Sequence, residues 1–245
     1  MAIGPTGSIA TLEADAWCGT GTVSVSHDGR PEPAATLTDA RDVRSVSWFH
    51  DGRLLLGFYD QAWTDNAGPK IELWDRNLTA PQHQLRVNDA GFDLVSAGSV
   101  VACTGIDLHL WWPGSNRQVF SLHHQDWGPA GEMGPCAISK DASRVAVVLD
   151  RWRETEDQVW VLDVDNPRSH KAIRDPTTKS ASHVALSSDG QLAALRIQET
   201  DHLRVYDLER VELVADWEAP GVQVIAFHGQ RRLLVGGSER TIWEI

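Results

Sequence analysis

A strand–turn–strand–loop–strand unit between Ser45 and Asp75 limits the possible folds of this chain more than any other feature. Its first two runs, Ser45–Phe49 and Arg53–Tyr59, have the apolar and β-branched composition of strands. Asp51-Gly52 between them predicts a tight turn, because both residue types tolerate positive φ. Ile71–Trp74 then alternates like a third strand. A chain built from this unit is all-β.

The same unit recurs along the whole chain. Its tight turn reappears at Pro5-Thr6-Gly7, Asp51-Gly52, Ala97-Gly98, Asp141-Ala142, Asp189-Gly190 and His228-Gly229. The five steps from Gly7 to Gly229 average about 44 residues, within the ~40–45 of a four-stranded propeller blade. We therefore expect one domain, residues 1–245, of about six units. Their expected bounds are 1–42, 43–90, 91–133, 134–181, 182–220 and 221–245.

Several third strands end in an aspartate, as in Trp74-Asp75, Leu162-Asp163 and Tyr206-Asp207. This ending and the repeated strand order resemble the WD-repeat and WD-like β-propeller superfamily. The resemblance implies an all-β propeller of about six blades with four antiparallel strands each. The Gly-His pair that usually opens a WD repeat does not occur in the sequence, so the buried Asp-His-Ser/Thr-Trp network of such repeats is not expected. A β-sandwich is the alternative, but it does not explain the repeated order.

Charge and cysteine usage restrict the environment and the partners. The net charge of −12 argues against a nucleic-acid backbone or an anionic membrane surface as the main partner. Cys18, Cys103 and Cys136 are widely spaced without a Cys-x-x-Cys motif, so we expect free thiols in a reducing compartment. The sequence has no signal-peptide pattern and no apolar run near the ~18 residues of a membrane span. We therefore expect a cytoplasmic protein.

Catalytic and metal-binding motifs give little support to an enzyme. There is no Gly-x-Ser-x-Gly nucleophile motif and no phosphate-binding Gly-rich loop. Asp163–Asn166 opens like a calcium loop, but Pro167 stands at the next ligand position, so we interpret it as a turn. The expected innermost strands carry only Asp93 and His183 as titratable groups near their starts, too few for a calcium cage. We expect no catalytic residue, metal or cofactor.

Tryptophans gather in the long loops that a propeller places on one face. Three loops between second and third strands contain Asp15-Ala-Trp17, Asp60-Gln-Ala-Trp63 and Asp150-Arg-Trp152, and a blade-linking loop contains Asp126-Trp127. Trp and Arg are the residue types enriched at binding hot spots. The predicted binding residues are therefore Trp17, Trp63, Trp127, Trp152, Arg151 and Arg153.

These loops predict a non-enzymatic scaffold that presents a Trp- and Arg-bearing face to an unidentified protein partner. Three alternatives remain open at this point. The tryptophans can instead pack on neighbouring blades. The chain can be a propeller enzyme or small-ligand binder acting at the channel mouth. It can also be a regulatory or sensor domain of a longer protein.

The sixth unit lacks a fourth strand. Its third strand, Thr241–Ile245, is expected to be an edge with unpaired backbone groups. Ile242, Trp243 and Ile245 are the predicted edge-pairing residues, with only Glu244 as a charged residue among them. Either the sequence lacks residues that complete the blade, or a partner strand adds there. A homodimer that pairs two such edges is the simplest form of the second possibility.

Overall fold

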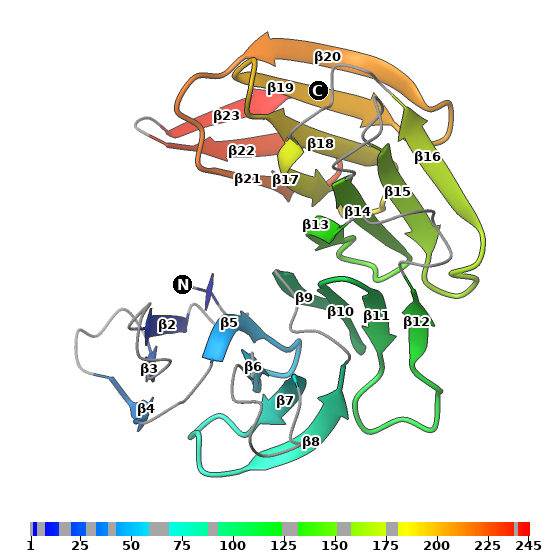
Figure 1. Ribbon diagram of the computed structural model, residues 1–245. Coiled ribbons are helices and arrows are strands. Elements are labelled where there is room, and N and C mark those ends of the chain that lie inside the picture. Colours follow the sequence, from blue (N-terminus) through cyan, green and yellow to red (C-terminus); the bar gives the residue numbers. More distant parts are fainter. Residues whose placement is uncertain are drawn as a thin grey trace. The chain divides into compact units, whose positions relative to one another are not determined.

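The computed structural model describes residues 2–3, 8–14, 21–27, 33–38, 43–58, 69–87, 93–123, 132–150, 158–174, 181–237 and 240–245. Within these ranges the chain forms 23 strands in six antiparallel sheets (Figure 1). They contain no helix, and hence none long and apolar enough to cross a membrane. The predicted all-β class and the three-stranded last sheet are both confirmed.

The chain divides into two compact units, of which the first is Met1–Leu122. Each of its three sheets follows the chain order from inner to outer strand. The sheets are formed by β1 (Ala2–Ile3), β2 (Ile9–Ala14), β3 (Gly21–Ser26) and β4 (Ala35–Leu37); by β5 (Val43–Trp48), β6 (Leu54–Phe58), β7 (Lys70–Trp74) and β8 (Pro81–Arg86); and by β9 (Asp93–Ala97), β10 (Val100–Thr104), β11 (Leu108–Trp111) and β12 (Phe120–Leu122).

The second unit, His123–Ile245, also has three sheets in chain order. They are formed by β13 (Glu132–Ile138), β14 (Arg144–Asp150), β15 (Gln158–Asp163) and β16 (His170–Arg174); by β17 (Ala181–Leu186), β18 (Leu192–Ile197), β19 (His202–Asp207) and β20 (Glu212–Glu218); and by β21 (Val224–His228), β22 (Arg232–Gly236) and β23 (Arg240–Glu244). In Figure 1 this unit runs from green to red. The prediction of a single domain stays a prediction.

Two strands begin three or more residues earlier than the sequence pattern predicts, since the pattern predicts strands over Gln84–Val87 and Cys136–Ser139. β8 starts at Pro81 instead of Gln84, which is possible because a proline without an N–H is tolerated at the start of an outer strand. β13 starts at Glu132 instead of Cys136, and its register shifts between Met133 and Cys136. That β-bulge accommodates a Gly-Pro pair that resembles a turn in the sequence.

The second strands of the four middle sheets, β6, β10, β14 and β18, are buried on both faces, which explains their continuous apolar runs. In the first unit, Leu54 and Leu56 pack with Val23 and Val25 of the first sheet. Leu55 between them points the other way and joins the core with the third sheet. The second unit repeats this arrangement with Ala193-Ala194-Leu195 of β18, whose alternate residues belong to different core clusters.

The tight turns of the fourth and fifth sheets share one hydrogen-bonded motif. The hydroxyl of Ser187, which is fully buried, donates to Asp189 Oδ1 at 2.7 Å and accepts the N–H of Leu192 at 2.9 Å. Ser139 makes the equivalent bonds with Asp141 at 2.7 Å and with the N–H of Arg144 at 3.0 Å. A serine two residues before the turn aspartate therefore fixes the turn that the repeat requires.

The aspartates that end third strands close the following turn. Asp75 Oδ1 accepts the N–H groups of Asn77 and Thr79 at 2.9 and 3.0 Å. Asp207 Oδ1 accepts those of Glu209 and Arg210 in the same way. Asp163 accepts the N–H groups of the two residues that follow Val164, which confirms that Asp163–Asn166 is a turn.

Acid is expected to destabilise the protein through these turns. The hydroxyl of Thr79 lowers the pKa of Asp75, and the backbone N–H of Arg210 lowers that of Asp207. Burial raises the pKa of Asp141, but hydrogen bonds from Ser139 and its neighbours outweigh burial, so this pKa is also lowered. A carboxylate with a lowered folded-state pKa contributes stability above its unfolded pKa of about 4, and this contribution disappears as the pH falls through the folded value.

The urea concentration at the unfolding midpoint should therefore begin to fall near pH 4 and decrease further toward pH 2. A double variant Asp75→Asn, Asp207→Asn should show a shallower fall, because neither amide titrates. Equal pH slopes for this variant and the wild type would contradict the assignment of acid sensitivity to the turns.

Candidate functional site at the edge of the last sheet

The loop residues predicted to bind a partner lie outside the described residues. Trp17, Trp63, Trp127, Trp152, Arg151 and Arg153 all belong to this group, as does Cys18. The predicted loop face therefore stays a prediction. Cys103 and Cys136 are buried and belong to no disulfide, as predicted. Within the described ranges, no three His, Cys, Asp or Glu side chains are grouped so that they could hold a metal ion.

The edge strand β23 is the predicted site that the structure does describe. β23 pairs antiparallel with β22, with Ile242 opposite Leu234 and Trp243 opposite Leu233. Among the described residues, no strand lies on its other side. The other five sheets each have a fourth strand in that place.

The register determines which backbone groups of β23 are free. The N–H of Ile245 donates to the carbonyl of Arg231 at 2.9 Å, so this is a hydrogen-bonded pair of the ladder. Such pairs alternate along an antiparallel ladder, so Thr241 and Trp243 direct their backbone groups toward β22. The N–H and C=O groups of Arg240, Ile242 and Glu244 consequently point to the outer side.

The two faces of this sheet differ in burial. Trp243 and Ile245 are half-buried against the fifth sheet, and the Trp243 ring lies 4.7 Å from that of Trp217. On the opposite face Ile242 is 64% exposed and Leu234 is 38% exposed. The three predicted edge residues therefore divide between the faces, because side chains alternate along a strand.

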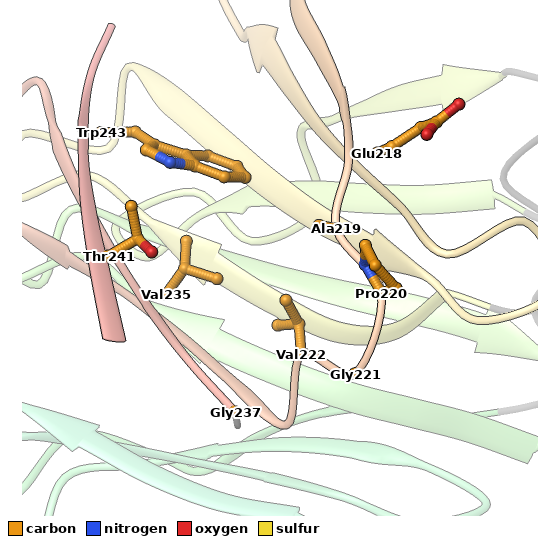
Figure 2. Close-up of a pocket in the computed structure, with 9 residues that line it drawn as sticks. All are labelled: Glu218, Ala219, Pro220, Gly221, Val222, Val235, Gly237, Thr241 and Trp243. Carbon is orange, nitrogen blue, oxygen red and sulfur yellow. The ribbon is translucent and has the colours of Figure 1, made fainter. Parts of the chain in front are cut away.

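A pocket of about 350 Å³ adjoins β23 on the packed face. Figure 2 shows the Trp243 ring and the Val235 side chain on one side of it and Ala219 and Pro220 on the other, with Val222 at the bottom. The remaining lining residues are Glu218, Gly221, Gly237 and Thr241. The carboxylate of Glu218 points away from the other lining side chains in Figure 2.

The residue types around this pocket favour an uncharged side chain over a charged substrate. Small and apolar residues dominate its lining, and Glu218 is the one charged residue among them. Binding sites for small polar ligands usually have several polar groups that converge on the ligand. This pocket instead offers an aromatic wall beside a strand with free backbone groups.

Sequence reasoning identified β23 but missed the pocket. Its floor comes from residues 219–222, which connect β20 to β21, and the sequence shows there only an Ala-Pro-Gly turn. It also missed the exposed Val224 and Leu234, because they alternate with buried Ile225 and Leu233 as in an ordinary strand.

Comparisons with known proteins establish the fold class. No protein-family model and no curated protein sequence matches the chain. Three solved structures that resemble it are a complex of KlAtg21 with the coiled-coil of AgAtg16, Kuenenia stuttgartiensis hydrazine synthase and Kluyveromyces lactis Hsv2. Their TM-scores are 0.70, 0.72 and 0.61, with sequence identities of 11%, 12% and 11%.

The similarity extends over most of each chain. It covers 97%, 100% and 93% of this chain and 81%, 82% and 67% of the respective solved chains. At such low identity it concerns the fold alone. Together with the six antiparallel sheets, it shows that the chain is an all-β propeller.

Proposed function

We propose that this chain is a non-enzymatic propeller that binds an extended segment of protein along β23. The observation that carries the proposal is the edge of β23, which no described strand covers, directly beside a pocket walled by Trp243 and Val235. An extended segment can add to such an edge through main-chain hydrogen bonds, while its alternate side chains enter pockets and provide specificity.

The geometry of the edge defines the pattern of the segment. Antiparallel addition pairs its backbone with Arg240, Ile242 and Glu244. Its residues opposite Thr241 and Trp243 point to the packed face, where the pocket lies. The outer strand β20 of the fifth sheet shows the same alternation. Its Trp217 lies opposite Leu203 of the third strand and packs against the core. The segment should therefore alternate apolar and polar residues.

The structural comparisons support a binding role without deciding it. KlAtg21 is in complex with a coiled-coil, which supports protein binding by a chain of this fold. Hydrazine synthase is named as an enzyme, so the fold alone is compatible with either role. The pocket has one charged lining residue and lies beside an edge strand, which favours binding of a peptide. The Trp- and Arg-bearing loop face predicted from the sequence is a second contact area in this proposal.

A displayed library of random peptides, selected on the immobilised 245-residue protein, tests the proposal. We expect enrichment of alternating apolar and polar sequences. Ile242→Pro should abolish their binding, since it removes an outward N–H that β22 does not use. Ile242→Ala is the matched control, because it shortens the side chain but keeps the donor, and it should weaken binding less. Selected peptides that bind the proline variant as well as the wild type would contradict the proposal.

A further inference from the structure

The free edge of β23 is complementary to itself. Resting on the proposed function, we infer that the segment bound along β23 is the same strand of a second copy of this chain. The two strands run antiparallel, and a twofold axis passes beside Ile242. This pairing joins the two last sheets into one continuous sheet of six strands.

The outward backbone groups of β23 suit this arrangement. They belong to Arg240, Ile242 and Glu244, which are spaced symmetrically about Ile242. With the axis at this residue, all three join hydrogen-bonded pairs with the second copy, and each pair exchanges two N–H···O bonds. If the axis passed beside Trp243 instead, Arg240 of each copy would have no opposite residue within β23. If it passed beside Thr241, Glu244 of each copy would have none.

The charges of the edge agree with the same register. Arg240 lies opposite Glu244 of the partner subunit, and by symmetry Glu244 lies opposite Arg240 of the partner subunit. Opposite charges directly across an antiparallel pair are stabilising, and like charges are destabilising. Within one subunit, Arg232 Nε already donates to Glu244 Oε1 at 3.1 Å. Pairing therefore extends this exposed ion pair into a row of alternating charge across both subunits.

The apolar residues of the exposed face also continue across the axis. Ala226, Leu234 and Ile242 lie side by side across the three strands of one sheet. Pairing brings the partner subunit's Ile242 next to Ile242. On the packed face Trp243 lies opposite Thr241 of the partner subunit, at the rim of the pocket. The second copy thus contributes a residue to the site.

The composition of the edge fits pairing better than protection. Natural edge strands often avoid pairing through lysine, proline or a bulge. The segment Arg240-Thr-Ile-Trp-Glu244 contains no lysine or proline, and its register with β22 is regular. Its two charged residues stand at opposite ends, where they attract a second copy in the antiparallel direction. A parallel second copy would place like charges together.

Sedimentation velocity over a range of concentrations, with two charge reversals, tests this inference. The wild-type protein should dimerise. Arg240→Glu places two glutamates at each end of the strand pair, and Glu244→Arg places two arginines there. Each variant alone should raise the dimer dissociation constant at least about tenfold. A 1:1 mixture of the two variants should restore dimers, because every opposing pair is then of opposite charge.

Arg231→Glu is the matched control. It makes the same charge change at an exposed turn residue outside β23, and it should leave the dimer unchanged. Equal melting temperatures of Arg240→Glu and the wild type would show that the variant is folded.

Three outcomes would overturn the inference. One is a wild-type protein that stays monomeric at its highest soluble concentration. Another is a dimer that neither reversal weakens, and the third is a mixture of the two variants that fails to associate. The peptide selection on the proline variant tests the edge separately, so a monomer that still binds selected peptides would reject the second copy as partner and leave the proposed function standing.

Discussion

Glu72→Ala is expected to lower the free energy of unfolding by about 3 kcal/mol. Glu72 is 4% exposed, and its carboxylate accepts a hydrogen bond from Trp74 Nε1 at 2.9 Å. Its other oxygen lies 2.7 Å from Lys70 Nζ, and that ammonium lies 4.8 Å from the centre of the Phe58 ring. In the alanine variant, Trp74 Nε1 and Lys70 Nζ both lose the Glu72 carboxylate as their partner.

The size of this effect follows from the burial of both partners. Removing one member of a fully buried ion pair typically costs about 3–5 kcal/mol. The Lys70 side chain is 29% exposed, so water can satisfy part of its charge, and we expect a value at the low end. Urea denaturation monitored by tryptophan fluorescence gives the measurement.

Two further variants separate the possible causes. Glu72→Gln keeps an oxygen that can accept from Trp74 Nε1, so it should cost less than the alanine variant. Glu212→Ala, at an exposed position, should change the unfolding free energy by no more than about 0.5 kcal/mol. A loss below about 1 kcal/mol for Glu72→Ala would show that the carboxylate is not an essential acceptor.

Gly237→Ala is expected to destabilise the second unit by about 2–3 kcal/mol. A Cβ at this position would lie 2.2 Å from the carbonyl oxygen of Gly221 and 3.3 Å from the Cα of Val222. Both contacts are with backbone, which cannot move away as a flexible side chain can. The β20–β21 connection must therefore shift, and it forms part of the pocket.

Gly229→Ala is the matched control for this prediction. Gly229 has a φ of +81°, but no atom lies within 4 Å of its added Cβ, so the variant should lose only about 1 kcal/mol from backbone strain. Unfolding free energies from urea titrations give the comparison. If the two alanine variants lost equal stability, the close approach of Gly237 to Gly221 would not be a structural constraint.

Gly237→Ala should also weaken binding of selected peptides, because the pocket changes shape.

Local sequence patterns were sufficient to predict most of the described strands, several of the turns and the all-β class. The reason is physical: alternation of side chains over about five residues, as in Thr22–Ser26, and an Asp-Gly pair such as Asp51-Gly52 act within one segment of chain. The three strands of the last described sheet were predictable in the same way, because each strand of the repeat has its own sequence pattern.

The chemistry of the candidate site depended on the tertiary structure. Whether Ile242 or Trp243 offers free backbone groups is set by the pairing of β23 with β22, which no single segment encodes. The pocket exists because the connection between β20 and β21 approaches the chain closely at Gly237, just after β22. The acceptor role of Glu72 depends on Lys70 and Trp74, whose side chains lie on the same face of β7. The sequence by itself determined where the strands run, whereas register and packing decided which of their atoms are left free to bind, because those relations form only between segments that folding brings together.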